Sequence, residues 1–193
     1  MSTLPKHFIT PEEYLEIERK AETKSEYYRG EMFAMSGASR YHSRLTTRLS
    51  KLIGNHLDER RCELHIAGMR VRVSQAAYCY PDLCVVCGDP QFADNEFDTL
   101  LNPNLLIEIL SPSTAGWDRT RKAQWYRAIP SLQEYLLVEQ DEPAITLYRR
   151  TTAGWTVIDV SGIDGEIELF SIAYTLRLRD LYEGILSEAE ASA

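Results

Sequence analysis

A carboxylate in the middle of an apolar run constrains this chain more than any other feature of its sequence. Glu108 lies within residues 105–110, and every other residue of that run is Leu or Ile. Such a composition predicts a central strand over residues 104–110 that is buried on both faces. Because an isolated buried carboxylate is costly, we expect Glu108 to be paired, hydrogen-bonded or bound to a metal ion.

A second acidic residue, Asp82, follows Pro81 and opens another apolar strand, which we expect over residues 82–87. Side chains alternate along a strand, so Glu108 shares a face with Leu106 and Leu110. If the two strands are adjacent, both carboxylates project into one cleft. Hard oxygen ligands of this kind suit Mg²⁺ or Mn²⁺.

The third polar residue of interest is Lys122, in a helix that we expect over residues 118–129. On this helix Lys122 lies on the same face as Trp125, Tyr126 and Ile129, so it begins a stripe that should pack inward. Two interpretations remain open. Lys122 can extend its ammonium into water with only its stem on the core, or it can serve the site formed by the carboxylates.

The other patterns predict one α/β domain with a mixed sheet, spanning residues 1–193. The residues Thr10-Pro11-Glu12-Glu13 form a capping box that begins a helix reaching about residue 20. We see no internal repeat, linker or low-complexity tract. The remaining elements are expected as strands at 31–35, at two places within 62–73 and at 134–139, an antiparallel meander at 144–150, 156–160 and 166–169, and helices at 42–57 and 179–184.

Composition limits the class of protein. The net charge of −8 argues against a protein that coats nucleic acid through bulk electrostatics, although a nuclease needs only local basic patches. The apolar runs are too short to span a bilayer, and no signal-peptide segment is visible, so we expect a cytoplasmic protein.

Four cysteines are present, and Cys84 and Cys87 are spaced as C-x-x-C. On a strand these two side chains point to opposite faces and cannot share one zinc ion. We therefore expect all four cysteines, which include Cys62 and Cys79, to be reduced core residues.

A row of arginines, Arg40, Arg44 and Arg48, recurs at four-residue intervals on the helix expected at 42–57. Such a row is usual for a solvated helix face and is also compatible with contacts to phosphate groups. Together with Arg70, Arg72, Arg119 and Arg121, these are the cations available for a nucleic-acid partner.

The order of several motifs resembles the bacterial Uma-type family of restriction-endonuclease-like proteins, in the PD-(D/E)xK nuclease superfamily. The resemblance covers the chain from Phe8 to about Gly184. One departure is that Leu110 stands where the superfamily usually has its lysine. The matching stretches are Thr10-Pro11-Glu12-Glu13-Tyr14, Ser25-Glu26-Tyr27, Gly30-Glu31, Pro81-Asp82, Glu108-Ile109-Leu110-Ser111-Pro112-Ser113-Thr114, Asp118 with Lys122, and Pro130-Ser131-Leu132-Gln133-Glu134-Tyr135.

The resemblance implies a restriction-endonuclease-like core with flanking helices and an added C-terminal meander. It implies a Mg²⁺- or Mn²⁺-dependent endonuclease that hydrolyses DNA, with Asp82, Glu108 and the backbone carbonyl of Ile109 as metal ligands. The superfamily lysine is then replaced by Lys122, and Glu26 is the additional carboxylate. His42 falls where such proteins often have a histidine, and a homodimer is expected because superfamily members often work as dimers.

Two other interpretations are open. The chain can be a catalytically inactive module with a nuclease fold that binds nucleic acid or protein. Alternatively, it can be an interaction protein in which Glu108 pairs with an arginine and no metal ion binds.

Overall fold

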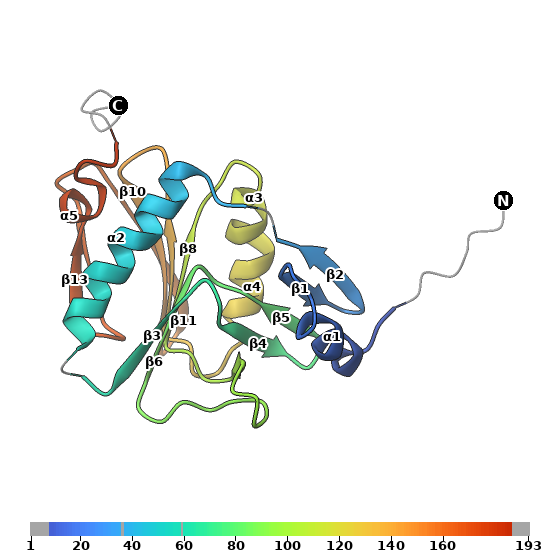
Figure 1. Ribbon diagram of the computed structural model, residues 1–193. Helices are drawn as coiled ribbons and strands as arrows, with labels where there is room; N and C mark the ends of the chain where they lie inside the picture. The colour runs from blue at the N-terminus through green and yellow to red at the C-terminus, as the bar shows by residue number, and fades with distance from the viewer. Residues whose placement is uncertain (1–7, 36, 59, 187–193) are drawn as a thin grey trace.

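The fold of this protein is given by a computed structural model, which describes residues 8–186 except 36 and 59. Figure 1 shows two larger sheets and a short hairpin, with helices between and around them. The six-stranded sheet has the order β11-β10-β9-β8-β6-β3, from β3 (Cys62–Ile66), β6 (Leu83–Cys87), β8 (Leu105–Ile109), β9 (Glu134–Val138), β10 (Ala144–Thr151) and β11 (Gly154–Ser161).

The five-stranded sheet has the order β2-β1-β5-β4-β7. It contains β1 (Ser25–Tyr28), β2 (Glu31–Ala34), β4 (Arg70–Ser74), β5 (Ala77–Cys79) and β7 (Thr99–Leu100). The hairpin pairs β12 (Glu166–Leu169) with β13 (Tyr174–Arg177). The helices are α1 (Pro11–Glu18), α2 (Arg40–Leu57), α3 (Ala115–Trp117), α4 (Ala123–Tyr126) and α5 (Leu178–Tyr182), with a π-helical turn η1 (Asp118–Lys122) between α3 and α4.

Strand β8 lies inside the six-stranded sheet, as its apolar run predicts. It pairs in parallel with β9 and antiparallel with β6, and all its residues are buried. On one face of the sheet Leu105, Ile107 and Ile109 pack with residues of α2. On the other face Leu106 and Leu110 pack with residues of α4. Helices therefore cover both faces of the sheet, and the predicted mixed α/β fold is confirmed.

The helical segment that follows β8 differs from its predicted bounds. It begins at Ala115 and ends at Tyr126, three residues earlier at each end than expected, and its middle turn is π-helical. A π-helical turn inserts one residue into the helix and is frequent at functional sites. Here it contains both Asp118 and Lys122, two buried charged residues.

One further expectation needs correction, and several strands were missed. Cys62 and Cys87 are directly opposite each other on β3 and β6 and form a disulfide, so only Cys79 and Cys84 are free buried thiols. The two strands expected within residues 62–73 are both present, as β3 and β4, and they belong to different sheets. Strands β1, β5, β7 and β13 were not predicted, because each is short or lacks an alternating pattern.

The N-terminal helix is confirmed in its capping. The Thr10 side chain accepts a hydrogen bond from the Glu13 backbone at 3.2 Å. The Glu13 side chain in turn accepts one from the Thr10 backbone at 2.7 Å. Tyr14 of α1 packs with Tyr27 and Tyr78 of the five-stranded sheet. Among the residues that the structure describes, no helix combines the length and apolarity needed to cross a membrane.

Candidate active site

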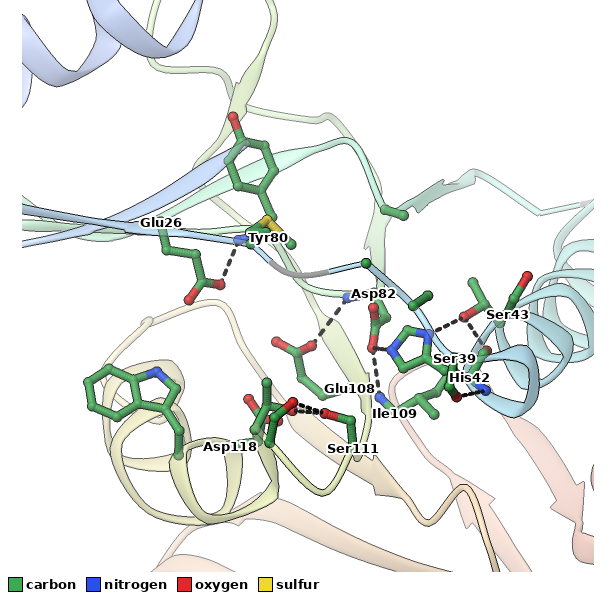
Figure 2. Close-up of a pocket in the computed structure, with 18 of the residues that line it drawn as sticks. Glu26, Ser39, His42, Ser43, Tyr80, Asp82, Glu108, Ile109, Ser111 and Asp118 are labelled. Carbon is green, nitrogen blue, oxygen red and sulfur yellow. Dashed lines mark hydrogen bonds and ion pairs between the residues drawn. The ribbon is translucent and has the colours of Figure 1, made fainter. Parts of the chain in front are cut away.

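A cavity of about 680 Å³ opens between α2, the β1–β2 hairpin, the ends of β6 and β8 and the helical segment 115–126. Figure 2 shows Glu26, Asp82, Glu108 and Asp118 directed toward it from different elements. His42 and Lys122 line the same cavity. The principal polar residues expected from the sequence are therefore gathered in one place.

The sheet register brings Asp82 and Glu108 together. Strands β6 and β8 are antiparallel with Leu83 opposite Ile107, so Asp82 lies beside the end of β8 that carries Glu108. The backbone of Ile109 donates to Oδ2 of Asp82 at 2.8 Å, and the backbone of Asp82 approaches Oε2 of Glu108 at 3.4 Å. The condition set from the sequence is therefore met, because the two strands are adjacent and both carboxylates line one cavity.

Lys122 is buried at the centre of this cluster. Its Nζ lies 2.8 Å from Oε1 of Glu26 and 2.9 Å from Oε1 of Glu108. A third carboxylate, Asp118, lies 3.5 Å away one helical turn earlier. Because the Lys122 side chain is only 8% exposed, its ammonium does not extend into bulk water. Of the two interpretations that the sequence left open, the structure supports the one in which Lys122 points into the site formed by the carboxylates.

Glu26 reaches the cluster from strand β1. Its Oε1 also accepts a hydrogen bond from the backbone of Tyr80 at 3.2 Å. The carboxylate is therefore positioned by the main chain as well as by Lys122, and it is not part of a surface ion pair. The partner of Glu108 is a lysine, not the arginine of the alternative interpretation.

One contributor was missed in the sequence, where Tyr126 was treated as apolar packing. The Tyr126 hydroxyl donates to Oε1 of Glu108 at 2.8 Å. Its position four residues after Lys122, on the same helix face, was the available signal. This second donor fixes the orientation of the Glu108 carboxylate.

His42 holds Asp82 from the opposite wall. Its Nε2 lies 3.0 Å from Oδ2 of Asp82, and this contact raises the pKa of His42. The Ser39 side chain caps α2 by accepting from the His42 backbone at 3.1 Å. The cap fixes the first turn of α2 and with it the imidazole that orients Asp82.

The cluster holds more negative than positive charge. Burial raises the pKa of Glu108 to about 8, opposed by Lys122 and reinforced by Asp82, Asp118 and Glu26. Burial alone would lower the pKa of Lys122, but Glu108 and Glu26 outweigh it and hold that pKa well above the ordinary value. The site therefore favours an additional positive charge, whether a proton or a cation.

The oxygen atoms that remain open fit a hard divalent cation. Oδ1 of Asp82 has no hydrogen-bond partner among the described residues, and Oε2 of Glu108 has one long contact at 3.4 Å. No group of three or more His, Cys, Asp or Glu residues in the described part of the chain is already arranged around one point. An ion held by one or two carboxylates keeps several waters, as Mg²⁺ usually does.

The arginines expected at a nucleic-acid interface are mostly used within the protein. Arg44 and Arg48 donate to backbone carbonyls of residues 180–185 and so attach α2 to the C-terminal segment. Arg70 is 2% exposed and contacts Tyr80 and Asp98, so the expectation that it contacts DNA is corrected.

Arg119 and Arg40, two further arginines of that expectation, differ from each other. Arg119 forms an ion pair with Glu139, which occupies its guanidinium. Arg40 is exposed at the first residue of α2, and its role in binding DNA stays a prediction.

Comparison with a solved structure supports the fold. A crystal structure titled as a putative nuclease of the DUF820 group from Anabaena variabilis ATCC 29413 superposes with a TM-score of 0.76. The match covers 92% of this chain and 99% of that one at 21% sequence identity. At this identity the similarity shows that the two proteins share a fold.

Comparisons of sequence show the family. The uncharacterized protein sll1609 of Synechocystis sp. PCC 6803 is 38% identical over 162 residues, covering 83% of this chain and 92% of that protein. Another from the same organism, slr1290, is 36% identical over 179 residues, covering 92% and 93%. Residues 11–178 match the model of the Uma2 family, which is described as putative restriction endonuclease, and the chain therefore belongs to that family.

Proposed function

We propose that this protein is a metal-dependent endonuclease that hydrolyses phosphodiester bonds in DNA. The observation that carries the proposal is the position of Lys122, whose buried ammonium lies between Glu26 and Glu108 beside an open cavity. A lysine and several carboxylates in one solvent-accessible cavity are a combination that phosphodiester hydrolysis uses. The family and the fold support a nuclease-like protein, and the proposal adds the metal ion and the substrate.

Asp82, Glu108 and the backbone carbonyl of Ile109 are the groups that would hold Mg²⁺ or Mn²⁺. When bound, such an ion lowers the pKa of a coordinated water and stabilises negative charge on a phosphate. His42 and the Ile109 backbone keep Oδ2 of Asp82 occupied, which leaves Oδ1 available to a ligand. Tyr126 similarly occupies Oε1 of Glu108 and leaves Oε2 with only one long contact.

Lys122 is the group that would meet the phosphate. Its ammonium is already desolvated and fixed, so it can orient a water or neutralise developing charge without first being ordered. Glu26 holds this ammonium at 2.8 Å and would keep it in place as the substrate binds. Asp118 lies 3.5 Å from the same ammonium, so its contribution is to maintain the charge of Lys122.

Cleavage of labelled DNA in Mg²⁺, in Mn²⁺ and in EDTA tests the proposal. The comparison is between wild type, Lys122→Gln and Lys51→Gln, where Lys51 is an exposed residue of α2 outside the cavity lining. We expect cleavage with either ion and none in EDTA. Lys122→Gln should lose at least about 100-fold in rate, the scale of removing one preorganised charged donor.

Two results would contradict the proposal. Full activity of Lys122→Gln would remove the lysine from the mechanism. Binding of DNA without cleavage by wild type, with either ion, would favour a catalytically inactive module that binds nucleic acid.

A further inference from the structure

One wall of the cavity is aromatic rather than charged. Phe33 of β2 and Trp117 of α3 both line it, with ring centroids 6.0 Å apart. Phe33 is 40% exposed, so a large apolar surface faces solvent next to a cluster of carboxylates. Exposed apolar side chains that line a cavity are typical of a ligand-binding surface.

The wall is held rigidly from behind. Trp117 meets Trp125 edge-on with ring centroids 5.3 Å apart, and Trp125 stacks on Tyr28 at 4.1 Å. Aromatic pairs in such arrangements have defined geometry. Trp117 is therefore positioned before any ligand arrives, as a stacking surface requires.

The wall begins immediately beside the carboxylate cluster. In the β1–β2 hairpin, Phe33 is directly opposite Glu26, which places their side chains next to each other on one face of the sheet. Trp117 directly precedes Asp118 in the helical segment. A ligand whose phosphate reaches Lys122 can thus place an attached planar group against Phe33 and Trp117.

Charge indicates how such a ligand is recognised. Among the described residues that line the cavity, the basic ones are Lys122 and His42, and both are paired with carboxylates. A duplex is gripped chiefly through cations that contact many phosphates, which this cavity does not offer. Proteins that bind unpaired strands add to such cations the stacking of bases on aromatic side chains, which this cavity does offer.

We infer that Phe33 and Trp117 form a stacking subsite for one unpaired base next to the phosphate that is cut. The substrate class is then single-stranded DNA, or DNA whose strands are separated at the cut. The inference rests on the proposed nuclease function for the identity of the ligand. It goes beyond that function in assigning these two aromatic residues and the unpaired state of the base.

The test compares a labelled single strand with the same strand annealed to its complement, in Mn²⁺. Binding is measured by fluorescence anisotropy on strands with phosphorothioate linkages, and cleavage is measured on normal strands. The variants are Trp117→Leu and Phe33→Leu, with Trp155→Leu as the matched control. Trp155 lies on β11 against Arg150 and does not line the cavity.

We expect wild type to prefer the single strand in both assays. Trp117→Leu and Phe33→Leu should each weaken single-strand binding by about 5- to 150-fold, the range for loss of one base–aromatic stack. Trp155→Leu should bind as wild type does. Since Phe33 is exposed, Phe33→Leu should keep the wild-type melting temperature even if Trp117→Leu does not.

A single abasic position moved along the strand adds a specific readout. At one position, loss of the base should weaken binding to wild type as much as Trp117→Leu does, with no further loss when both changes are combined. Additive losses at every position, or equal binding by wild type, Trp117→Leu and Phe33→Leu, would overturn the subsite. If no form cleaves DNA but both variants still lose single-strand binding, the subsite stands and the nuclease proposal fails.

Discussion

Replacing Lys122 with Met tests whether the ammonium holds the carboxylates of the site together. Methionine keeps most of the stem but removes the charge that Glu26 and Glu108 contact at 2.8 and 2.9 Å. Both the ammonium and the Glu108 carboxylate are nearly inaccessible to solvent, with side chains 8% and 5% exposed. The variant leaves acidic groups facing one another with their central cation gone.

The size of the effect follows from burial. Removing one partner of a buried ion pair costs about 3–5 kcal/mol, because the remaining charge is neither solvated nor paired. For a domain of this length each kcal/mol shifts the melting temperature by roughly 2–4 °C, which gives a loss of roughly 6–20 °C. The exposed Lys51→Met changes the net charge equally and should alter stability by less than about 0.5 kcal/mol.

The loss of stability in Lys122→Met, relative to wild type, should grow with pH. The folded-state pKa of Glu108 is raised to about 8, so the folded protein binds a proton that the unfolded chain releases near its ordinary value. Stability from this group is present at low pH and is lost as the pH rises through about 8. Without Lys122 the pKa of Glu108 rises further, so as the pH rises through about 8 the variant must either hold this proton or bury an unpaired charge, and its loss of stability grows.

Urea unfolding of wild type, Lys122→Met and Lys51→Met in EDTA, at pH 5.5 and pH 8, measures both effects. A loss in Lys122→Met smaller than about 1 kcal/mol at pH 8 would refute the reasoning, since a buried pair cannot be removed so cheaply. If Lys122→Met loses more stability at pH 5.5 than at pH 8, the raised pKa of Glu108 cannot be the cause of the pH dependence.

Three further predictions concern the site and the scaffold. Tyr126→Phe should lower the free energy of unfolding by about 1–3 kcal/mol, because a buried hydrogen bond to Glu108 is lost, as chemical denaturation can show. Asp98, whose pKa is lowered by hydrogen bonds from Arg19, stabilises the fold above about pH 4 and not in strong acid. Asp98→Asn should therefore destabilise the protein by about 1 kcal/mol at pH 7 and by less near pH 2, with equal losses at both pH values counting against this. Reduction of the Cys62–Cys87 disulfide, which closes a loop of 25 residues, should cost about 3–4 kcal/mol, and Cys62→Ser should abolish the response of the melting temperature to dithiothreitol.

The polar centre of the site could be predicted because its residues contradict their surroundings. Glu108 in an apolar strand and Lys122 at the start of an apolar helix face each violate the expected pattern, and such violations mark sites. The structure brings both together with Asp82 and Glu26. Glu26 itself was assigned from the resemblance, because no local pattern distinguishes it from a surface carboxylate.

The features that were missed depend on tertiary contacts. The Cys62–Cys87 disulfide needs the register of β3 against β6, which two separate apolar strands do not reveal. The π-helical turn, which contains the buried Asp118 and Lys122, was also missed, because helical periodicity alone does not reveal one inserted residue. The arginine row showed the right periodicity, but its partners lie more than 100 residues away, at the C-terminal segment.

The central claim is that Asp82 and Glu108 hold a divalent cation beside Lys122, and titration calorimetry with Mn²⁺ tests it most directly. The comparison uses wild type, Asp82→Asn and the distant Asp98→Asn at pH 8, where Glu108 can release its proton. We predict that Mn²⁺ binds at one site on wild type and on Asp98→Asn, and at least about tenfold more weakly on Asp82→Asn, on the scale of 1.4 kcal/mol per tenfold. Equal affinity in all three, or no binding to wild type, would contradict the account.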